Sequence, residues 1–184
     1  MEILIADDEP IIRMGLKAML QEMGHRVTAA SNGREALRLA RRQQFDLAIL
    51  DIKMPYTDGL QTARTLALTS PLPVLLLTAF SERDLVEEAS DLPIQGYLVK
   101  PVQPGQLSAS IAVAHKRFVE AQARAAQTQQ LAQQAERQQV IDRAKGKLMA
   151  GGLSEDAAHR VLQRQARNGR RPMHEVAQEI LDAS

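Results

Sequence analysis

The stretch Asp46-Leu47-Ala48-Ile49-Leu50-Asp51 decides the fold predicted for this chain. A short apolar run bounded by charged residues is typical of a strand that is buried on both faces of a parallel sheet. Two further apolar runs end in the same way: Ile3-Leu4-Ile5-Ala6 leads into Asp7-Asp8-Glu9, and Gly96-Tyr97-Leu98-Val99 leads into Lys100. We therefore expect several buried strands, each followed at once by charged side chains.

The front half of the chain alternates between strand and helix signals. The predicted strands are residues 2–6, 26–30, 46–50, 73–77 and 96–99. Segments with helical spacing of apolar residues lie between them, at residues 9–23, 33–43, 58–69 and 82–90. This alternation predicts right-handed βαβ units, and hence an α/β fold whose five-stranded parallel sheet is covered by helices on both faces.

The charged residues that follow the strands form a candidate site. In an open parallel sheet, side chains just beyond the carboxyl ends of the strands converge on one crevice. We expect Asp7, Asp8 and Asp51 to meet there, with Lys100 opposite them and Glu9 beside the first pair. Each aspartate alone would more commonly cap a turn or a helix, but their shared edge of the sheet favours a common site.

Three carboxylates in one place are costly without a cation, and Mg²⁺ prefers oxygen ligands. We expect Asp8 and Asp51 to bind Mg²⁺, while Asp7 ligates it directly or through a water. The main-chain carbonyl of Lys53 is a candidate for a further ligand.

The same residues predict phosphoryl chemistry. The Asp51 carboxylate can attack a phosphorus atom in line and become an aspartyl phosphate. Lys100 can neutralise the acceptor and then pair with a phosphoryl oxygen, and Thr78 can donate its hydroxyl to another.

Composition narrows the class of protein. The 184 residues suit one or two domains, and the absence of cysteine excludes disulfides and cysteine-based zinc sites. No apolar run approaches the roughly 18 residues that span a bilayer, and no basic segment precedes the first strand, so we expect a cytoplasmic protein without membrane association.

Residues 1–110 carry 11 Lys and Arg against 14 Asp and Glu, whereas residues 111–184 carry 12 against 8. This asymmetry predicts two modules with different partners.

Residues 106–145 contain neither glycine nor proline and are rich in Ala, Gln, Arg and Glu, which predicts a long helix. Along this helix, mostly apolar or small residues recur at alternating intervals of three and four positions. They are Ile111, Ala114, Phe118, Ala121, Ala125, Thr128, Ala132 and Ala135. The pattern is heptad-like, and two interpretations stay open. The helix forms a coiled coil, between chains or within one, or it is a solvated linker.

Two shorter helices follow. Ser154 and the two acidic residues after it are typical of an N-cap with an acidic first turn, so we expect a helix over residues 154–167, ended by Asn168-Gly169. Pro172 then predicts the first turn of a last helix. With the end of the long helix, these segments would form a small three-helix unit.

Residues 1–120 resemble the receiver domain of bacterial two-component response regulators. The resemblance rests on Asp7-Asp8-Glu9, Asp51-Ile52-Lys53-Met54-Pro55, Asp58-Gly59, Thr78-Ala79 and Lys100-Pro101, with Tyr97 at the family's switch aromatic. It implies a flavodoxin-like fold, a sensor histidine kinase as phosphodonor and Asp51 as acceptor. It implies no enzymatic activity beyond self-phosphotransfer and autodephosphorylation. It further implies that Thr78 moves toward the phosphoryl group and that Tyr97 fills the vacated space. Val102 departs from the aromatic that the family more commonly has.

The stretch at residues 140–149 is distinctive because an apolar stripe runs beside the cations Arg143, Lys145 and Lys147. Gly146 within a helix costs about 1 kcal/mol relative to alanine. The glycine would be explained if a ligand or a second helix approaches closely at this position.

The tail at residues 128–184 resembles the ANTAR domain, an RNA-binding module of transcription antitermination regulators. The resemblance covers about residues 128–182. The matching residues are Ile141, Ala144-Lys145-Gly146, Leu148-Met149, Ser154-Glu155, Ala158, Leu162, Ala166 and Val176-Ala177. The resemblance implies structured RNA as partner, namely leader hairpins whose loop bases are read. His159 stands where the family usually has an aromatic. It can stack on an unpaired base, or it is simply an exposed helix residue.

Basic residues of the tail are the candidate RNA contacts. Arg160, Arg164 and Arg167 recur at spacings that place them on one face of a helix. The full candidate set is Arg143, Lys145, Gly146, Lys147, His159, Arg160, Arg164 and Arg167. The alternative is a solvated charged face that binds nothing.

These predictions describe a response regulator with a receiver domain at residues 1–120, a connecting helix or coiled coil at residues 106–140 that overlaps both modules, and an RNA-binding domain at residues 128–184. We expect phosphorylation of Asp51 to control RNA binding and transcription antitermination, with a homodimer in the phosphorylated state. The alternative is a receiver-controlled dimerisation or protein-interaction module without RNA binding. DNA is disfavoured as a partner because the sequence shows no helix-turn-helix with a recognition helix.

Overall fold

The computed structural model describes residues 1–79 and 94–183. Its sheet is parallel, with the strand order β2-β1-β3-β4-β5. The strands are β1 (Glu2–Ala6), β2 (Arg26–Ala30), β3 (Leu47–Asp51), β4 (Val74–Thr78) and β5 (Gly96–Val99). This order is the flavodoxin-like, doubly wound arrangement, so the predicted fold class is confirmed. The helix predicted at residues 82–90 lies outside the described residues.

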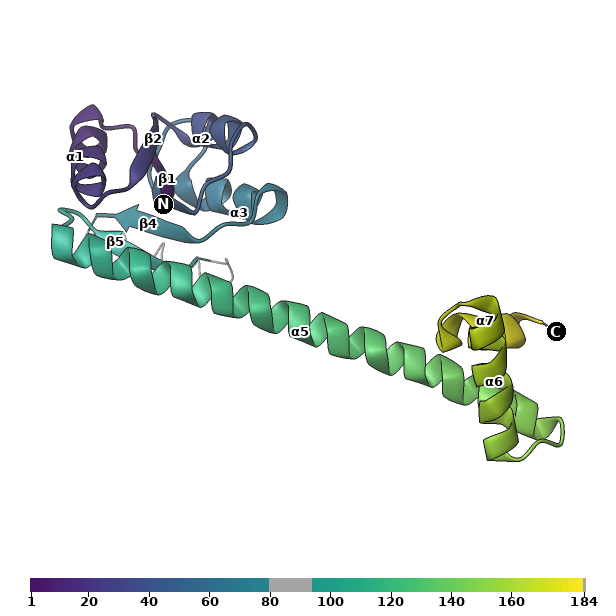
Figure 1. Ribbon diagram of the computed structural model, residues 1–184. Coiled ribbons are helices and arrows are strands. Elements are labelled where there is room, and N and C mark those ends of the chain that lie inside the picture. The colour runs from purple at the N-terminus through teal and green to yellow at the C-terminus, as the bar shows by residue number, and fades with distance from the viewer. Residues whose placement is uncertain (80–93, 184) are drawn as a thin grey trace. The chain divides into compact units, whose positions relative to one another are not determined.

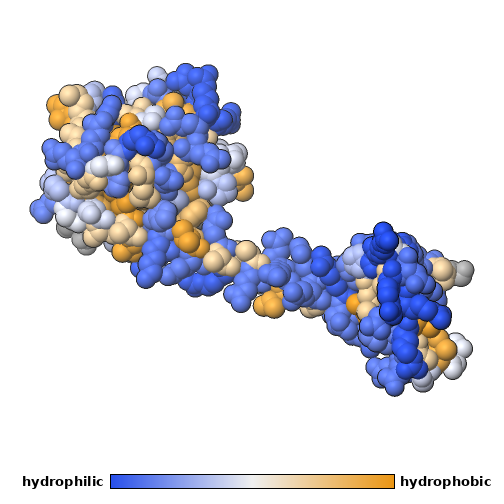
Figure 2. Space-filling model, viewed as in Figure 1, coloured by the Kyte–Doolittle hydropathy of each residue, from blue (hydrophilic) through white to orange (hydrophobic). Residues whose placement is uncertain are grey.

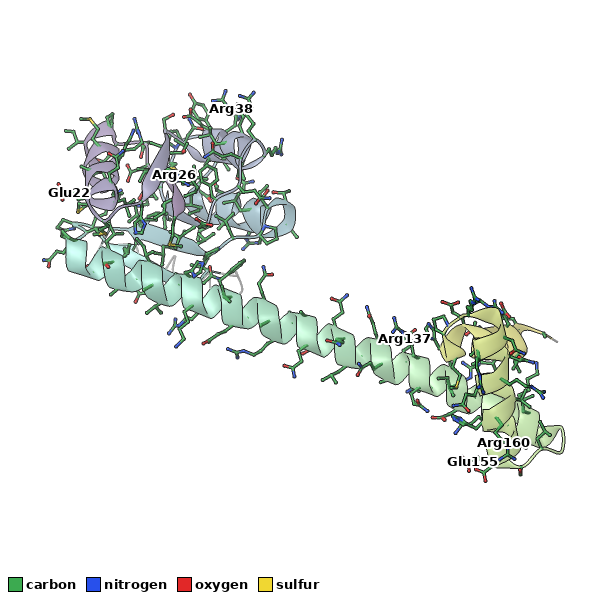
Figure 3. All side chains as sticks on the ribbon, in the orientation of Figure 1. Glu22, Arg26, Arg38, Arg137, Glu155 and Arg160 are labelled. Atoms are coloured by element: carbon green, nitrogen blue, oxygen red, sulfur yellow. The ribbon has the colours of Figure 1, made fainter. Side chains whose placement is uncertain are left out.

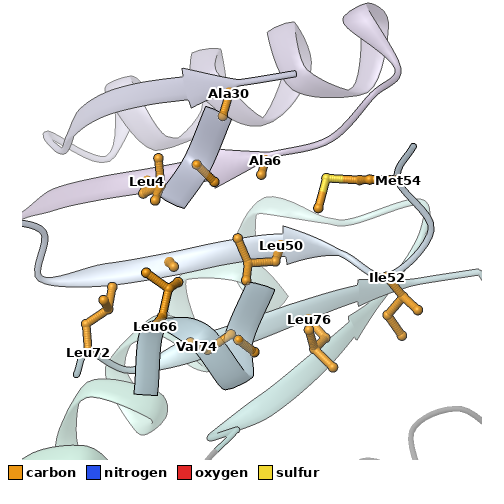
Figure 4. Close-up of a cluster of buried hydrophobic side chains, with 13 residues drawn as sticks. Leu4, Ala6, Ala30, Leu50, Ile52, Met54, Leu66, Leu72, Val74 and Leu76 are labelled. Atoms are coloured by element: carbon orange, nitrogen blue, oxygen red, sulfur yellow. The ribbon is translucent and has the colours of Figure 1, made fainter. Parts of the chain in front are cut away.

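Helices cover both faces of the sheet (Figure 1). They are α1 (Pro10–Glu22), α2 (Gly33–Ala40), α3 (Gly59–Thr69) and the beginning of α5 (Pro104–Ala150). Because successive strand residues point to opposite faces, β1 contributes Leu4 to the core beneath α2 and α3 (Figure 4), and Ile5 to the core beneath α1 and α5. Both side chains are fully buried.

Several element boundaries differ from the sequence prediction. α1 and α3 each begin one residue later than predicted, and α1 also ends one residue earlier. β3 and β4 each lie one residue further along the chain than predicted, and so they include Asp51 and Thr78 as their last residues. α2 ends at Ala40 instead of residue 43, because the Leu39 carbonyl accepts hydrogen bonds from two later amides and the chain turns toward β3. The predicted long helix is confirmed as one continuous helix.

The heptad-like series along α5 divides into two parts. Ile111 and Ala114 are buried in the core of the sheet unit, whereas residues 121–139 are all exposed. No described residue therefore covers the middle of this helix, although the exposed stretch still fits a coiled coil with a partner helix. Among the helices that the structure describes, none combines the length and apolar character needed to cross a bilayer.

The second compact unit comprises residues 123–184, and it contains the end of α5, α6 (Glu155–Gly169) and α7 (Met173–Asp182). Its small core consists of Ala144, Leu162, Val176 and Ala177, with partly buried residues packed around them. Ser154 caps α6 as predicted, since its side chain accepts a hydrogen bond from the amide of Ala157.

Two predicted details at the helix ends of this unit are wrong. α6 continues through Gly169, and the chain turns at Arg170, whose backbone is left-handed with φ of 50°. Pro172 precedes α7 as its N-cap residue and is not part of its first turn. Both corrections concern where a backbone turns, which the side-chain pattern constrains only weakly.

Candidate acidic site at the carboxyl edge of the sheet

The register of the strands brings the predicted site residues together. Ala6 pairs with Leu50, so the next residues, Asp7 and Asp51, lie side by side at the carboxyl edge of the sheet. Thr78 pairs with Val99, which places Lys100 directly beyond that pair. Residues far apart in the sequence therefore meet at one edge, as predicted.

The Lys100 side chain bridges the carboxylates. Its Nζ lies 2.9 Å from Asp7 Oδ2, 2.9 Å from Asp51 Oδ1 and 3.8 Å from Glu9 Oε1. The Lys100 side chain is only 17% exposed, and those of Asp7 and Asp51 are 0% and 7% exposed. Such shielded charges interact more strongly than exposed pairs.

The carboxylates also fit a divalent cation. Ligand oxygens of Asp7, Asp8 and Asp51 lie within 4.8 Å of one another. Asp7 Oδ1 accepts a hydrogen bond from the Glu9 amide, but Asp7 Oδ2 is buried and has no hydrogen-bond donor among the described residues. The nearby ammonium gives it an electrostatic contact without a directed hydrogen bond. A buried oxygen with an unused lone pair beside two further carboxylates suits Mg²⁺.

Burial and charge shift the acidity of the site. Burial raises the pKa of Asp51 from 3.8 to about 6; Lys100 opposes this shift, and the negative charges of Asp7 and Asp8 add to it. Burial alone would lower the pKa of Lys100, but its close contacts with the carboxylates of Asp7 and Asp51 outweigh that effect and raise it. Lys100 is thus held firmly in its charged form, while Asp51 takes up a proton at a higher pH than an ordinary aspartate does.

The two predicted switch residues occupy different environments. Thr78 is 1% exposed, and its hydroxyl donates to the Ala79 carbonyl at 3.0 Å. Tyr97, in contrast, is 53% exposed. It lines a groove of about 310 Å³ between β5 and α5, whose other walls include Leu75 and Val113.

A second groove opens beside the acidic residues. It has a volume of about 440 Å³, and its lining includes Asp8, Lys53, Met54 and Asp58. Asp8 is exposed, unlike its neighbour Asp7, so it reaches the site from the solvent side. The loop that carries Lys53 therefore borders the same space as an acidic ligand candidate.

Two residues shape the site in ways that the sequence analysis did not identify. Arg13 of α1 donates from Nη1 to the main-chain carbonyl of Asp7 at 2.6 Å, which anchors the loop between β1 and α1. A Cβ on Gly59 would lie 2.1 Å from the carbonyl oxygen of Asp51, so only glycine fits there. Gly59 stood out in the sequence only as part of a motif, and nothing in the sequence marked Arg13.

The tail residues predicted to contact RNA fall into two groups. Lys145 and Lys147 form contacts within the tail: Lys145 pairs with Asp142 and Glu155, and Lys147 binds main-chain carbonyls at the end of α7. The others have no ion pair within the described residues, and all are exposed: Arg143, His159, Arg160, Arg164 and Arg167.

Gly146 is exposed, and a Cβ at this position would meet no atom within 4 Å. The interpretation that it lets a second helix of this chain pack closely is therefore wrong for the described residues.

Comparisons with known proteins agree with this geometry. Residues 3–112 match the response regulator receiver domain, and residues 129–181 match the ANTAR domain. The chain is 40% identical over 182 residues to the transcriptional regulatory protein PdtaR of Mycobacterium tuberculosis, which covers 98% of this chain and 89% of that protein.

Solved structures resemble the first unit. A receiver domain from Clostridium thermocellum matches with a TM-score of 0.60 and 33% identity, over 63% of this chain and 94% of that one. The receiver domain of a sensor histidine kinase from Pseudomonas aeruginosa, solved with a magnesium ion in its active site cleft, matches with a TM-score of 0.57 and 29% identity, over 62% and 97%.

The fold and the acidic edge thus define a receiver module. The chain belongs to the response regulators that join a receiver domain to an ANTAR domain.

Proposed function

We propose that a sensor histidine kinase phosphorylates this protein on Asp51, and that phosphorylation controls RNA binding by the ANTAR tail and so transcription antitermination. The observation that carries the first half is the bridge from Lys100 to Asp7 and Asp51 at 2.9 Å, at the edge where Asp8 also lies. The ANTAR match supports the second half.

The phosphotransfer step follows from the site. The ionised Asp51 carboxylate attacks phosphorus, the bond between phosphorus and the donor histidine nitrogen breaks, and that nitrogen leaves as neutral imidazole after protonation. Lys100 then pairs with a phosphoryl oxygen, and the Thr78 hydroxyl donates to another. Mg²⁺ held by Asp7, Asp8, Asp51 and the Lys53 carbonyl would neutralise the charge that gathers on the transferred group.

The conformational step links the phosphorylated Asp51 to Tyr97 through Thr78. Phosphorylation adds roughly −1.5 to −2 charge and new acceptor oxygens. The Thr78 hydroxyl would exchange its bond with the Ala79 carbonyl for one with the phosphoryl group. The exposed Tyr97 ring would then turn inward and reshape the groove between β5 and α5.

In this proposal, residues 1–120 form the receiver, residues 106–140 the connecting helix, and residues 128–184 the RNA-binding module. The exposed stretch of α5 at residues 121–139 would pair with a second copy in the phosphorylated state. Two tails held together would engage two hairpins with a gain in effective concentration. The same exposed stretch favours one second candidate function: a receiver-controlled dimerisation or protein-interaction module that binds no RNA.

A filter-binding assay separates the two candidates. Wild-type protein and the Asp51→Asn variant are incubated with Mg²⁺, with or without acetyl phosphate, and then titrated with structured RNA. We expect phosphate incorporation and a gain in RNA affinity for the wild type alone. Negligible affinity in both states, even at low salt, would leave the interaction-module function. Phosphate retained on Asp51→Asn would move the acceptor to another residue.

A further inference from the structure

The cations of the tail differ in how many of their hydrogen-bond donors are already used. Lys147 Nζ lies 2.9 Å from the carbonyl oxygen of Ile180, 3.3 Å from that of Leu181 and 2.6 Å from that of Ala183. An ammonium group has three N–H donors. All three donors of Lys147 are therefore engaged by the main chain, although the residue lies at the surface.

The position of these carbonyls gives the contact a structural role. Ile180 and Leu181 belong to the last turn of α7, where main-chain carbonyls have no partner within the helix and the helix dipole is negative. Among the main-chain amides that the structure describes, the Ala183 amide caps this end by donating to the Glu179 carbonyl. The Lys147 side chain thus completes the C-cap of α7 from the neighbouring helix α5.

Lys145 has a similar role at α6. Its Nζ lies 3.0 Å from Asp142 Oδ1 and 3.3 Å from Glu155 Oε1, and its side chain is only 18% exposed. Glu155 is the first residue of α6 (Figure 3), where an acidic side chain suits the positive end of the helix dipole. The two lysines therefore tie α5 to the start of α6 and to the end of α7.

The arginines of α6 have no such partners. Arg160, Arg164 and Arg167 line an open groove of about 450 Å³, with Ala157 and Val161 as its apolar lining. No carboxylate borders this groove, and no ion pair involves these arginines within the described part of the chain. Three free guanidinium groups around an apolar surface match phosphates and the planes of unpaired bases. In Figure 2 the side of the tail that faces the viewer is largely hydrophilic.

We propose that Lys145 and Lys147 assemble the tail and do not contact RNA, whereas the arginine groove of Arg160, Arg164 and Arg167 binds the unpaired loop of an RNA hairpin. This inference rests on the proposed RNA-binding function and divides its candidate residues by role. The core between the three helices is small, so the lysine contacts hold α6 and α7 in the arrangement that presents the groove.

The test compares Lys147→Met with Arg164→Gln in the full chain. Hydrogen exchange followed by mass spectrometry reports the protection of α7, and titrations with hairpins of randomised loop sequence at several salt concentrations report the number of phosphate contacts. Lys147→Met should speed exchange in α7. It should leave the salt slope, the slope of the logarithm of the binding constant against the logarithm of the salt concentration, unchanged. The reason is that a partly unfolded tail lowers the apparent affinity for RNA but keeps its RNA contacts. Arg164→Gln should leave exchange unchanged, weaken binding roughly tenfold and flatten the slope by about 0.7.

Two further variants keep the test decisive. If Lys147→Met unfolds the tail, Lys145→Met serves as the second lysine variant. We expect it to leave the salt slope unchanged as well. Arg171→Gln removes the same charge as Arg164→Gln, but Arg171 is already paired with Glu179 at 2.9 Å, so its loss should not change the slope. A flattened slope in a lysine variant with normal exchange, or an unchanged slope in Arg164→Gln, would overturn the assignment.

The outcome also separates this inference from the function on which it rests. If the wild type binds none of the hairpins at low salt, the proposed RNA binding and the arginine assignment both fail. The lysine assignment is then judged by exchange alone, and normal protection of α7 in both lysine variants would overturn it.

Discussion

Lys100 and Asp51 meet at 2.9 Å across the end of β4, the strand that separates β3 from β5 in the sheet. The contact exists because the carboxyl ends of parallel strands share one edge. An ammonium in this position makes an otherwise unfavourable group of carboxylates tolerable, and it competes with a metal ion for them.

Lys100→Met should make this competition visible. Without the ammonium, the metal-free protein should lose about 3 kcal/mol of stability, because buried carboxylates remain without a counter-charge. Mg²⁺ should then bind more tightly and restore more stability than it does in the wild type. Urea unfolding over a Mg²⁺ titration measures both effects, with Lys17→Met on the exposed face of α1 as the control. Equal responses to Mg²⁺ in the wild type and Lys100→Met would contradict the competition.

The raised pKa of Asp51 predicts how pH affects stability. Its folded-state pKa of about 6 exceeds the ordinary value of 3.8, so protonation favours the folded state. That contribution is fully present below pH 3.8 and is lost as the pH rises through 6. In the presence of a chelator, lowering the pH from 7 to 5 should stabilise the wild type by about 1 kcal/mol relative to Asp51→Asn.

Denaturant unfolding at the two pH values provides the measurement. The comparison with Asp51→Asn cancels other groups, such as Glu35, whose lowered pKa acts in the opposite direction. Saturating Mg²⁺ should remove the difference, because a bound cation keeps Asp51 ionised. Identical pH dependence of the two proteins without metal would show that the carboxyl group is not perturbed.

Gly59→Ala should destabilise the receiver unit by about 2 kcal/mol or more, because the new methyl group would lie 2.1 Å from the Asp51 carbonyl oxygen. The displaced strand end should also slow phosphate incorporation from acetyl phosphate. Gly15→Ala is the matched control: its Cβ meets nothing within 4 Å, and it should stabilise α1 by about 1 kcal/mol. Thermal unfolding of both variants distinguishes crowding from a general effect of alanine.

Gly146→Ala separates helix stability from ligand contact in the tail. The added methyl group has free space, so the tail should gain about 1 kcal/mol of stability. RNA affinity should nevertheless fall, because no part of the described chain uses the space beside this glycine and a close ligand would. Hydrogen exchange across α5 and filter binding measure the two effects. Unchanged affinity in the more stable variant would remove Gly146 from the RNA site.

Much of the receiver site was predictable because it follows from strand ends. An apolar run followed by Asp7-Asp8, and another followed by Asp51, needed only the rule that parallel strands end at one edge. The burial of the two neighbouring aspartates could not be predicted from the strand pattern: Asp7 is buried, whereas Asp8 is exposed. Arg13 was not found, since its partner is a main-chain carbonyl and leaves no mark in the sequence.

The sequence by itself determined the order of strands and helices, the acidic residues at the strand ends and the basic character of the tail, because these follow from local periodicity and composition. Only the tertiary structure decided which cations of the tail are free. Lys147 and the carbonyl of Ile180 are 33 residues apart in the chain and meet only when three helices pack together. Charge is a property of each residue, but the partner that uses the charge depends on distance in space.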